Sequence, residues 1–138
     1  MSETDIALAS DMMALGLFEA FGIELEYMLV DDALNVTPAV PALFTKVNGK
    51  LTDRIALDDE IAWSNELVAH VLELKTDGPA PTLATLGQAF TKHIRQINQY
   101  LMDEKIRLLP TAAHPWMNPK TDTVLWPNGQ RDIYQAYD

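Results

Sequence analysis

The sequence predicts an α+β fold, in which an antiparallel sheet packs against one long amphipathic helix. Residues 22–30 and 71–76 are predicted strands, because the first alternates between apolar and polar side chains and the second is rich in Val and Leu. Residues 82–105 are a predicted helix, because apolar side chains recur there at spacings of three and four. The helix follows several strands rather than alternating with them, which favours an antiparallel sheet over a repeating parallel one.

The first elements of the chain are predicted to be a helix and a strand. Residues 3–20 carry a loose apolar face with helical spacing, which Gly22 interrupts. In the strand over residues 22–30, alternation places Glu24 and Glu26 on one face and most apolar side chains on the other. Two like charges, roughly 6–7 Å apart along the strand, therefore point the same way from a strand that should be half buried.

The middle of the chain is predicted to contain a hairpin. Asn48-Gly49 is a strong two-residue turn signal, so residues 44–57 are expected to form two short antiparallel strands. Pro38 and Pro41 discourage a long regular element just before them.

The last elements are predicted to be the long helix, a strand and the beginning of another helix. The strand is expected over residues 107–113, and the second helix is expected to begin within residues 130–138. His93 lies beside the apolar stripe of the long helix and is expected at the surface. The sequence shows no repeat and no linker, so residues 1–138 are expected to form a single domain.

Composition and charge exclude several classes of protein. The chain has 138 residues, no cysteine and a formal net charge of −10, from 20 Asp plus Glu against 10 Lys plus Arg. The lack of cysteine excludes disulfides, iron–sulfur clusters and a Cys nucleophile, and the acidic charge disfavours nucleic-acid partners while suiting hard cations. There is no Gly-rich phosphate loop, no signal peptide and no apolar run long enough for a membrane helix. A cytoplasmic protein without a membrane partner is therefore predicted.

The pair of Glu24 and Glu26 has two interpretations. On the pattern alone, the simpler one is a solvated face of an antiparallel sheet. The alternative is a shared divalent cation, because two carboxylates this close repel each other unless a cation or a proton lies between them. Mg²⁺ would suit such oxygen ligands and would keep positions open for phosphate oxygens.

A second acidic segment comes later in the chain. Glu73 interrupts an apolar strand, as Glu24 does, and is either the partner of Lys75 on a solvated face or a third carboxylate of the cation site. Glu66 lies seven residues earlier and could join Glu73 only if a turn or bulge separates them.

The histidines outside the long helix give weaker signals. His114 lies between a strand and a proline, where a structural hydrogen-bonding role is more common than catalysis. His70 falls on the strand face opposite to Glu73 and is not expected to be a co-ligand.

Four segments together resemble the glutamate–cysteine ligase family 2, a group of carboxylate–amine ligases. They are FGIELEYMLVD (residues 21–31), with a Gly-x-Glu-x-Glu strand, SNELVAHVLELKT (64–76), LLPTAAHPWMNP (108–119) and DIYQAYD (132–138). The segments occur in the family's order and extend over essentially the whole chain.

The resemblance implies a glutamine-synthetase-like fold, in which an antiparallel sheet curls into a funnel and inward-facing carboxylates hold Mg²⁺ or Mn²⁺. It implies ATP-dependent amide formation, in which the γ-carboxylate of glutamate attacks the terminal phosphoryl group and an amine such as that of cysteine attacks the acyl phosphate. That chemistry belongs to glutathione biosynthesis. The residues that it implicates are the metal ligands Glu24, Glu26 and Glu73 and the substrate-binding residues Glu66, His114 and Arg131, with Glu66 serving either the substrate or the metal.

Length separates this chain from the family pattern. Family members are usually more than twice as long, so the chain is expected to be the N-terminal part of a larger catalytic domain and to be inactive alone. One alternative is a non-catalytic module or truncated fragment that assembles, with itself or a partner, through exposed strand edges. Another is a structural domain whose acidic strand face is simply solvated.

Overall fold

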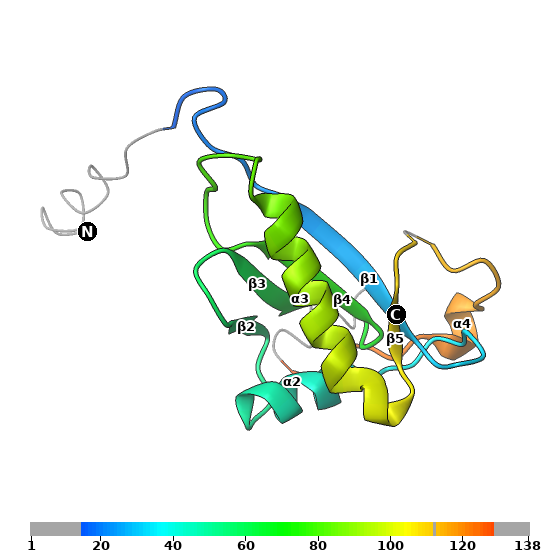
Figure 1. Ribbon diagram of the computed structural model, residues 1–138. Helices are drawn as coiled ribbons and strands as arrows, with labels where there is room; N and C mark the ends of the chain where they lie inside the picture. The colour runs from blue at the N-terminus through cyan, green and yellow to red at the C-terminus, as the bar shows by residue number, and fades with distance from the viewer. Residues whose placement is uncertain (1–14, 112, 129–138) are drawn as a thin grey trace, which may run out of the picture.

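The computed structural model describes residues 15–111 and 113–128. These residues form a five-stranded antiparallel sheet in the order β2-β3-β4-β1-β5, with helices packed on it (Figure 1), which confirms the predicted α+β class. The elements in chain order are β1 (Glu24–Val30), α2 (Val40–Asn48), β2 (Arg54–Ala56), β3 (Ile61–Asn65), β4 (Val71–Thr76), α3 (Leu86–Leu101), a short 3-10 helix (Met102–Glu104), β5 (Arg107–Leu109) and α4 (Pro119–Asp122).

The strand register gives the sheet two chemically different faces. Alternation places Leu25, Tyr27 and Leu29 of β1 on the same face as Trp63, the β3 residue that pairs with Leu74 of β4. On the other face, a row of polar residues crosses four strands at paired positions. This row, from β1 to β2, is Glu26, Glu73, Ser64 and Arg54. We call this side of the sheet the acidic face.

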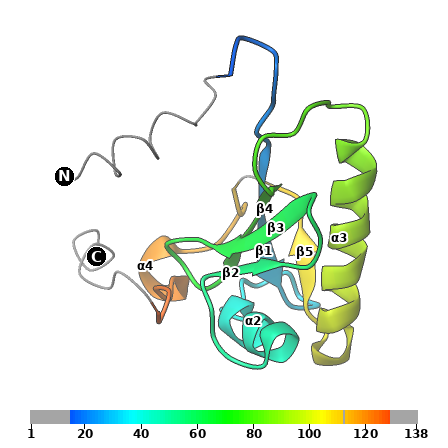
Figure 2. The ribbon, with the colours of Figure 1, turned by 90° about the vertical axis from the view of Figure 1, so that its left-hand side faces the viewer.

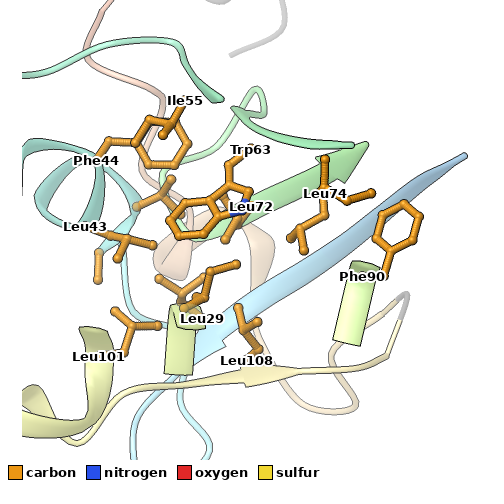
Figure 3. Close-up of a cluster of buried hydrophobic side chains, with 14 of the residues drawn as sticks. Leu29, Leu43, Phe44, Ile55, Trp63, Leu72, Leu74, Phe90, Leu101 and Leu108 are labelled. Carbon is orange, nitrogen blue, oxygen red and sulfur yellow. The ribbon is translucent and has the colours of Figure 1, made fainter. Parts of the chain in front are cut away.

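The two longer helices, α2 and α3, pack on the apolar face. Helix α3 runs along it, while α4 lies on the other side of the sheet (Figure 2). The core brings together side chains from the sheet and from both longer helices around Trp63, which is fully buried (Figure 3). The residues labelled around Trp63 are Leu29, Ile55, Leu72, Leu74 and Leu108 from the strands, Leu43 and Phe44 from α2, and Phe90 and Leu101 from α3. On the acidic face, Ser64 and Glu73 are buried near the middle of the sheet, while Glu24 and Glu26 of β1 are exposed.

The hairpin predicted over residues 44–57 is wrong. Residues up to Asn48 belong to α2, and Gly49, with φ of 78°, ends this helix in the left-handed conformation and donates its N–H to the carbonyl of Thr45. Pro41 stands in the first turn of the helix, where its missing N–H costs nothing. An Asn-Gly pair can end a helix as well as form a hairpin turn. Here the helix forms because one face of α2 is buried in the core. The actual hairpin is β2–β3.

Other predicted boundaries shift or fall outside the described residues. Residues 15–20 are not helical, and residues 3–14 of the predicted N-terminal helix lie outside the description. The long helix begins at Leu86 rather than at residue 82. The last strand ends at Leu109, just before Pro110, rather than at residue 113. The predicted helix within residues 130–138 also lies outside the described part of the chain.

Candidate metal centre

Three glutamates converge on the acidic face. Glu26 of β1, Glu73 of β4 and Glu66 of the connection between β3 and β4 each offer one carboxylate oxygen, and these oxygens all lie within 4.8 Å of one another. We call this group the carboxylate cluster. Glu73 is buried, Glu66 is half-buried and Glu26 is exposed, so the cluster lies open to solvent on the Glu26 side.

Glu73 is the most firmly held member of the cluster. Its position on β4 lies opposite Glu26 on one side and Ser64 on the other. The hydroxyl of Ser64 donates a hydrogen bond to Oε2 of Glu73, and Nζ of Lys75 lies 2.6 Å from the same oxygen. Only 7% of the Glu73 side chain is exposed. The contact between Glu73 and Lys75 considered from the sequence is therefore present, but it lies within the cluster.

Glu66 reaches the cluster because a turn separates it from β4. Strand β3 ends at Asn65 and β4 begins at Val71, so Glu66 begins the connection and is freed from the strict alternation of a continuous strand. This is the condition under which the sequence allowed Glu66 to join Glu73. Ser64 was missed in the sequence, although its place next to apolar Trp63 puts it on the opposite face, with Glu73.

Glu66 is affected both by its burial and by the two carboxylates beside it. Burial raises the pKa of the Glu66 carboxyl above its ordinary value of 4.5, and the nearby charges of Glu73 and Glu26 raise it further. A backbone hydrogen bond from Leu67 and the charge of Lys75 oppose this increase without cancelling it. The proton is therefore held more tightly by Glu66 than by an exposed glutamate.

Glu66→Gln is expected to stabilise the chain at neutral pH when divalent cations are removed. Because the folded chain binds the Glu66 proton more tightly than the unfolded chain does, wild-type stability falls as pH rises from the ordinary Glu range through the raised pKa. Gln carries no titrating proton, so this fall disappears. Urea unfolding with a chelator, from about pH 4 to pH 7, measures the effect. Exposed Glu60→Gln is the control, and wild-type and E66Q curves that stay parallel would contradict the expectation.

Glu24 lies next to the cluster rather than in it. It is exposed on β1 opposite Lys75, and it is not part of the group of three converging carboxylates. With Glu26, Pro110 and Thr111 it lines an open hollow of about 330 Å³ beside the end of β5. Whether Glu24 binds a metal stays a prediction.

Of the two predicted substrate-binding residues near the C-terminus, His114 is described by the structure and Arg131 lies outside the described residues. Both ring nitrogens of His114 contact backbone groups, since Nδ1 accepts from the N–H of Met117 (3.0 Å) and Nε2 lies 2.6 Å from the carbonyl oxygen of Leu34. These contacts tie the segment after β5 to the loop after β1. His114 also lines a hollow of about 260 Å³ beside exposed Trp116.

His93 is buried, and its predicted position at the surface is wrong. Its ring is inaccessible to solvent, with Nδ1 accepting a hydrogen bond from Nε1–H of Trp63 (2.8 Å) and Nε2 lying 2.9 Å from Oδ2 of Asp58. The buried face of α3 therefore extends beyond the apolar stripe seen in the sequence. The polar ring of His93 can lie inside the core because these two partners satisfy both of its nitrogens. His70 is also buried, and burial lowers its pKa.

The cluster suits a divalent cation of the hard type. Three carboxylates supply oxygen ligands, and an octahedral ion such as Mg²⁺ would keep further positions for water or phosphate oxygens. A cation there would also neutralise the charges that raise the pKa of Glu66. Fold and site together define an α+β protein with three glutamate carboxylates converging on one face of an antiparallel sheet.

Comparison with known proteins gives the family. The chain belongs to the glutamate–cysteine ligase family 2, whose family model matches residues 20–138. An uncharacterized protein of Archaeoglobus fulgidus is 26% identical over 117 residues, which are 85% of this chain and 31% of that protein. The chain thus spans about a third of the length of this curated relative. No solved structure matches the chain. No helix within residues 15–111 and 113–128 is long and apolar enough to cross a membrane.

Proposed function

We propose that this chain supplies the metal-binding sheet of an ATP- and Mg²⁺-dependent carboxylate–amine ligase. The observation that carries the proposal is the convergence of Glu26, Glu66 and Glu73 within 4.8 Å, in a chain of the glutamate–cysteine ligase family 2. These glutamates come from two neighbouring strands and the connection that follows a third, so the fold itself, rather than one local motif, assembles the site.

The chain's own residues would hold the cation and fix its position. Glu73, held by Ser64 and by strands on both sides, would be the fixed ligand, while Glu26 and Glu66 would close around the ion from the open side. The bound cation would neutralise the phosphate oxygens of ATP. The open face of the sheet would then position anionic groups against each other, which is the main task of a protein that catalyses phosphoryl transfer.

The finer proposal concerns substrates. The reaction would join the γ-carboxylate of glutamate to an amine such as that of cysteine, through an acyl phosphate formed at the expense of ATP. His114 and Arg131 would lie near the substrate. Support for these assignments comes from the family and from the order of the matching segments.

Titration with Mn²⁺, followed by the electron paramagnetic resonance signal of the free ion, tests the metal centre. Glu73→Gln and Glu26→Gln are each expected to weaken binding more than about tenfold, since the loss of even a supporting residue commonly costs that much. Glu60→Gln, on the exposed β2–β3 turn, is the matched control and should bind as wild type does.

The same titration on Glu24→Gln distinguishes the three carboxylates that converge in the structure from the ligand set that the family resemblance implies, which includes Glu24. The carboxylate cluster predicts an effect well below that of Glu73→Gln, because Glu24 is not one of the three converging carboxylates. An equally large loss would make Glu24 a ligand. Equal, weak binding by wild type and all variants would favour a merely solvated acidic face.

A further inference from the structure

We propose that the ammonium group of Lys75 is a built-in counter-ion of the carboxylate cluster, which a divalent cation must displace from Glu73. This inference rests on the proposed function and adds a regulatory element to the same site. Lys75 Nζ lies 2.6 Å from Oε2 of Glu73, the buried member of the cluster.

The position of Lys75 follows from the strand register. Lys75 lies two residues after Glu73 on β4, so both side chains leave the sheet on the acidic face. Lys75 is paired with Glu24 on one side and with small Ala62 on the other. Its side chain is one-third exposed, with 33% of its surface accessible, so it can leave Glu73 without unpacking the core.

Charge explains why the lysine is needed when no metal is bound. A buried carboxylate is costly unless a cation or hydrogen-bond donors face it, and Lys75 is the ammonium that contacts Glu73. A divalent cation bound by Glu73 would compete with this ammonium for the same oxygen, Oε2.

The proposal predicts two opposite effects of Lys75→Met. The metal-free variant should melt at a lower temperature than wild type, because buried Glu73 loses its counter-ion. Its affinity for Mn²⁺ should be on the order of tenfold higher, because no ammonium group competes with the ion for Oε2 of Glu73. A merely structural lysine would lower stability without raising affinity, and a distant charge would raise affinity without lowering stability.

The experiment combines Mn²⁺ titration with thermal unfolding, with and without saturating Mn²⁺. Mn²⁺ should raise the melting temperature of Lys75→Met more than that of wild type, since tighter binding to the folded state stabilises it more. Lys75→Gln provides a second variant in case Met perturbs the fold. Lys46→Met is the charge-matched control, because Lys46 lies on α2 and pairs with Glu104 away from the cluster.

A double-mutant cycle shows whether Lys75 acts through Glu73. Adding Lys75→Met to Glu73→Gln should change Mn²⁺ affinity no more than about twofold, since the shared oxygen has lost its charge. Equal Mn²⁺ affinity of wild type, Lys75→Met and Lys75→Gln would overturn the counter-ion proposal and leave the proposed function standing. Absence of Mn²⁺ binding in wild type and in both Lys75 variants would overturn both.

Discussion

Trp63→Ala is expected to lower the free energy of unfolding by roughly 3–5 kcal/mol, the range for truncating a large buried aromatic side chain. Trp63 is fully buried at the centre of the apolar face, between the sheet and α3. The substitution would leave a cavity and would also remove the N–H that His93 accepts at Nδ1. Urea unfolding followed by circular dichroism measures the loss.

Two further variants divide this effect into its parts. Trp63→Phe keeps an aromatic ring but leaves the buried Nδ1 of His93 without its donor, so it should still cost about 1–3 kcal/mol. Trp116→Ala is the control, because Trp116 is 57% exposed, and it should cost less than about 1 kcal/mol. A loss for Trp63→Ala no larger than that of Trp116→Ala would show that Trp63 does not anchor the core.

Asp58→Asn is expected to cost roughly 1.5–3 kcal/mol at neutral pH, the range for hydrogen bonds to a charged group. Oδ2 of Asp58 accepts from Lys92 Nζ (2.7 Å) and faces Nε2 of His93 (2.9 Å). Since Nδ1 of His93 already accepts from Trp63, its neutral ring must carry the proton on Nε2 and needs an acceptor there. Asn has one acceptor oxygen and an NH2 group that donates. In Asp58→Asn, one of the two carboxylate oxygens is therefore replaced by a group that cannot accept a hydrogen bond.

The cost of Asp58→Asn should disappear in acid. Burial alone would raise the pKa of Asp58, but hydrogen bonds from Lys92, from two backbone N–H groups and from His93 outweigh burial and hold the pKa well below its ordinary value of 3.8. The stabilisation is therefore complete above the unfolded pKa and is lost as pH falls through the lower folded pKa.

Urea unfolding of both proteins at neutral pH and in strong acid measures this convergence. Asp59→Asn, an exposed neighbour in the same turn, is the matched control and should follow wild type at every pH. A constant difference between wild type and Asp58→Asn across the pH range would mean that the ionisation of Asp58 does not support the fold.

The parts of the fold that the sequence predicted well are those where burial repeats along one element. Period-two alternation located β1, the Val- and Leu-rich run gave β4, and spacings of three and four gave α3. The prediction failed where a local signal has two structural uses. Asn48-Gly49 can turn a hairpin or end a helix, and only the tertiary burial of α2 decides between them.

For the site, the sequence could mark acidic residues on a strand face but not their distances. Glu66 joins Glu73 because β3 ends one residue before Glu66, and strand ends are set by tertiary pairing rather than by local pattern. The same limit applies to His93, whose burial depends on a donor 30 positions away in Trp63 and an acceptor 35 positions away in Asp58. Contacts of such separation leave no periodic trace in a single sequence.

The central place of β4 in the sheet would affect how the proposed metal centre responds to ions of different radius. Backbone amides of β4 should exchange slowly with deuterium, since β3 and β1 pair with nearly its whole length. Glu66 instead follows a strand end, and β5 pairs with β1 only from Met28 onward. As proposed ligands, one rigid carboxylate and two adjustable ones would adapt to bonds of about 2.0–2.1 Å or to the longer bonds of Ca²⁺. Discrimination between ions would then depend on their hydration rather than on a cage of fixed size.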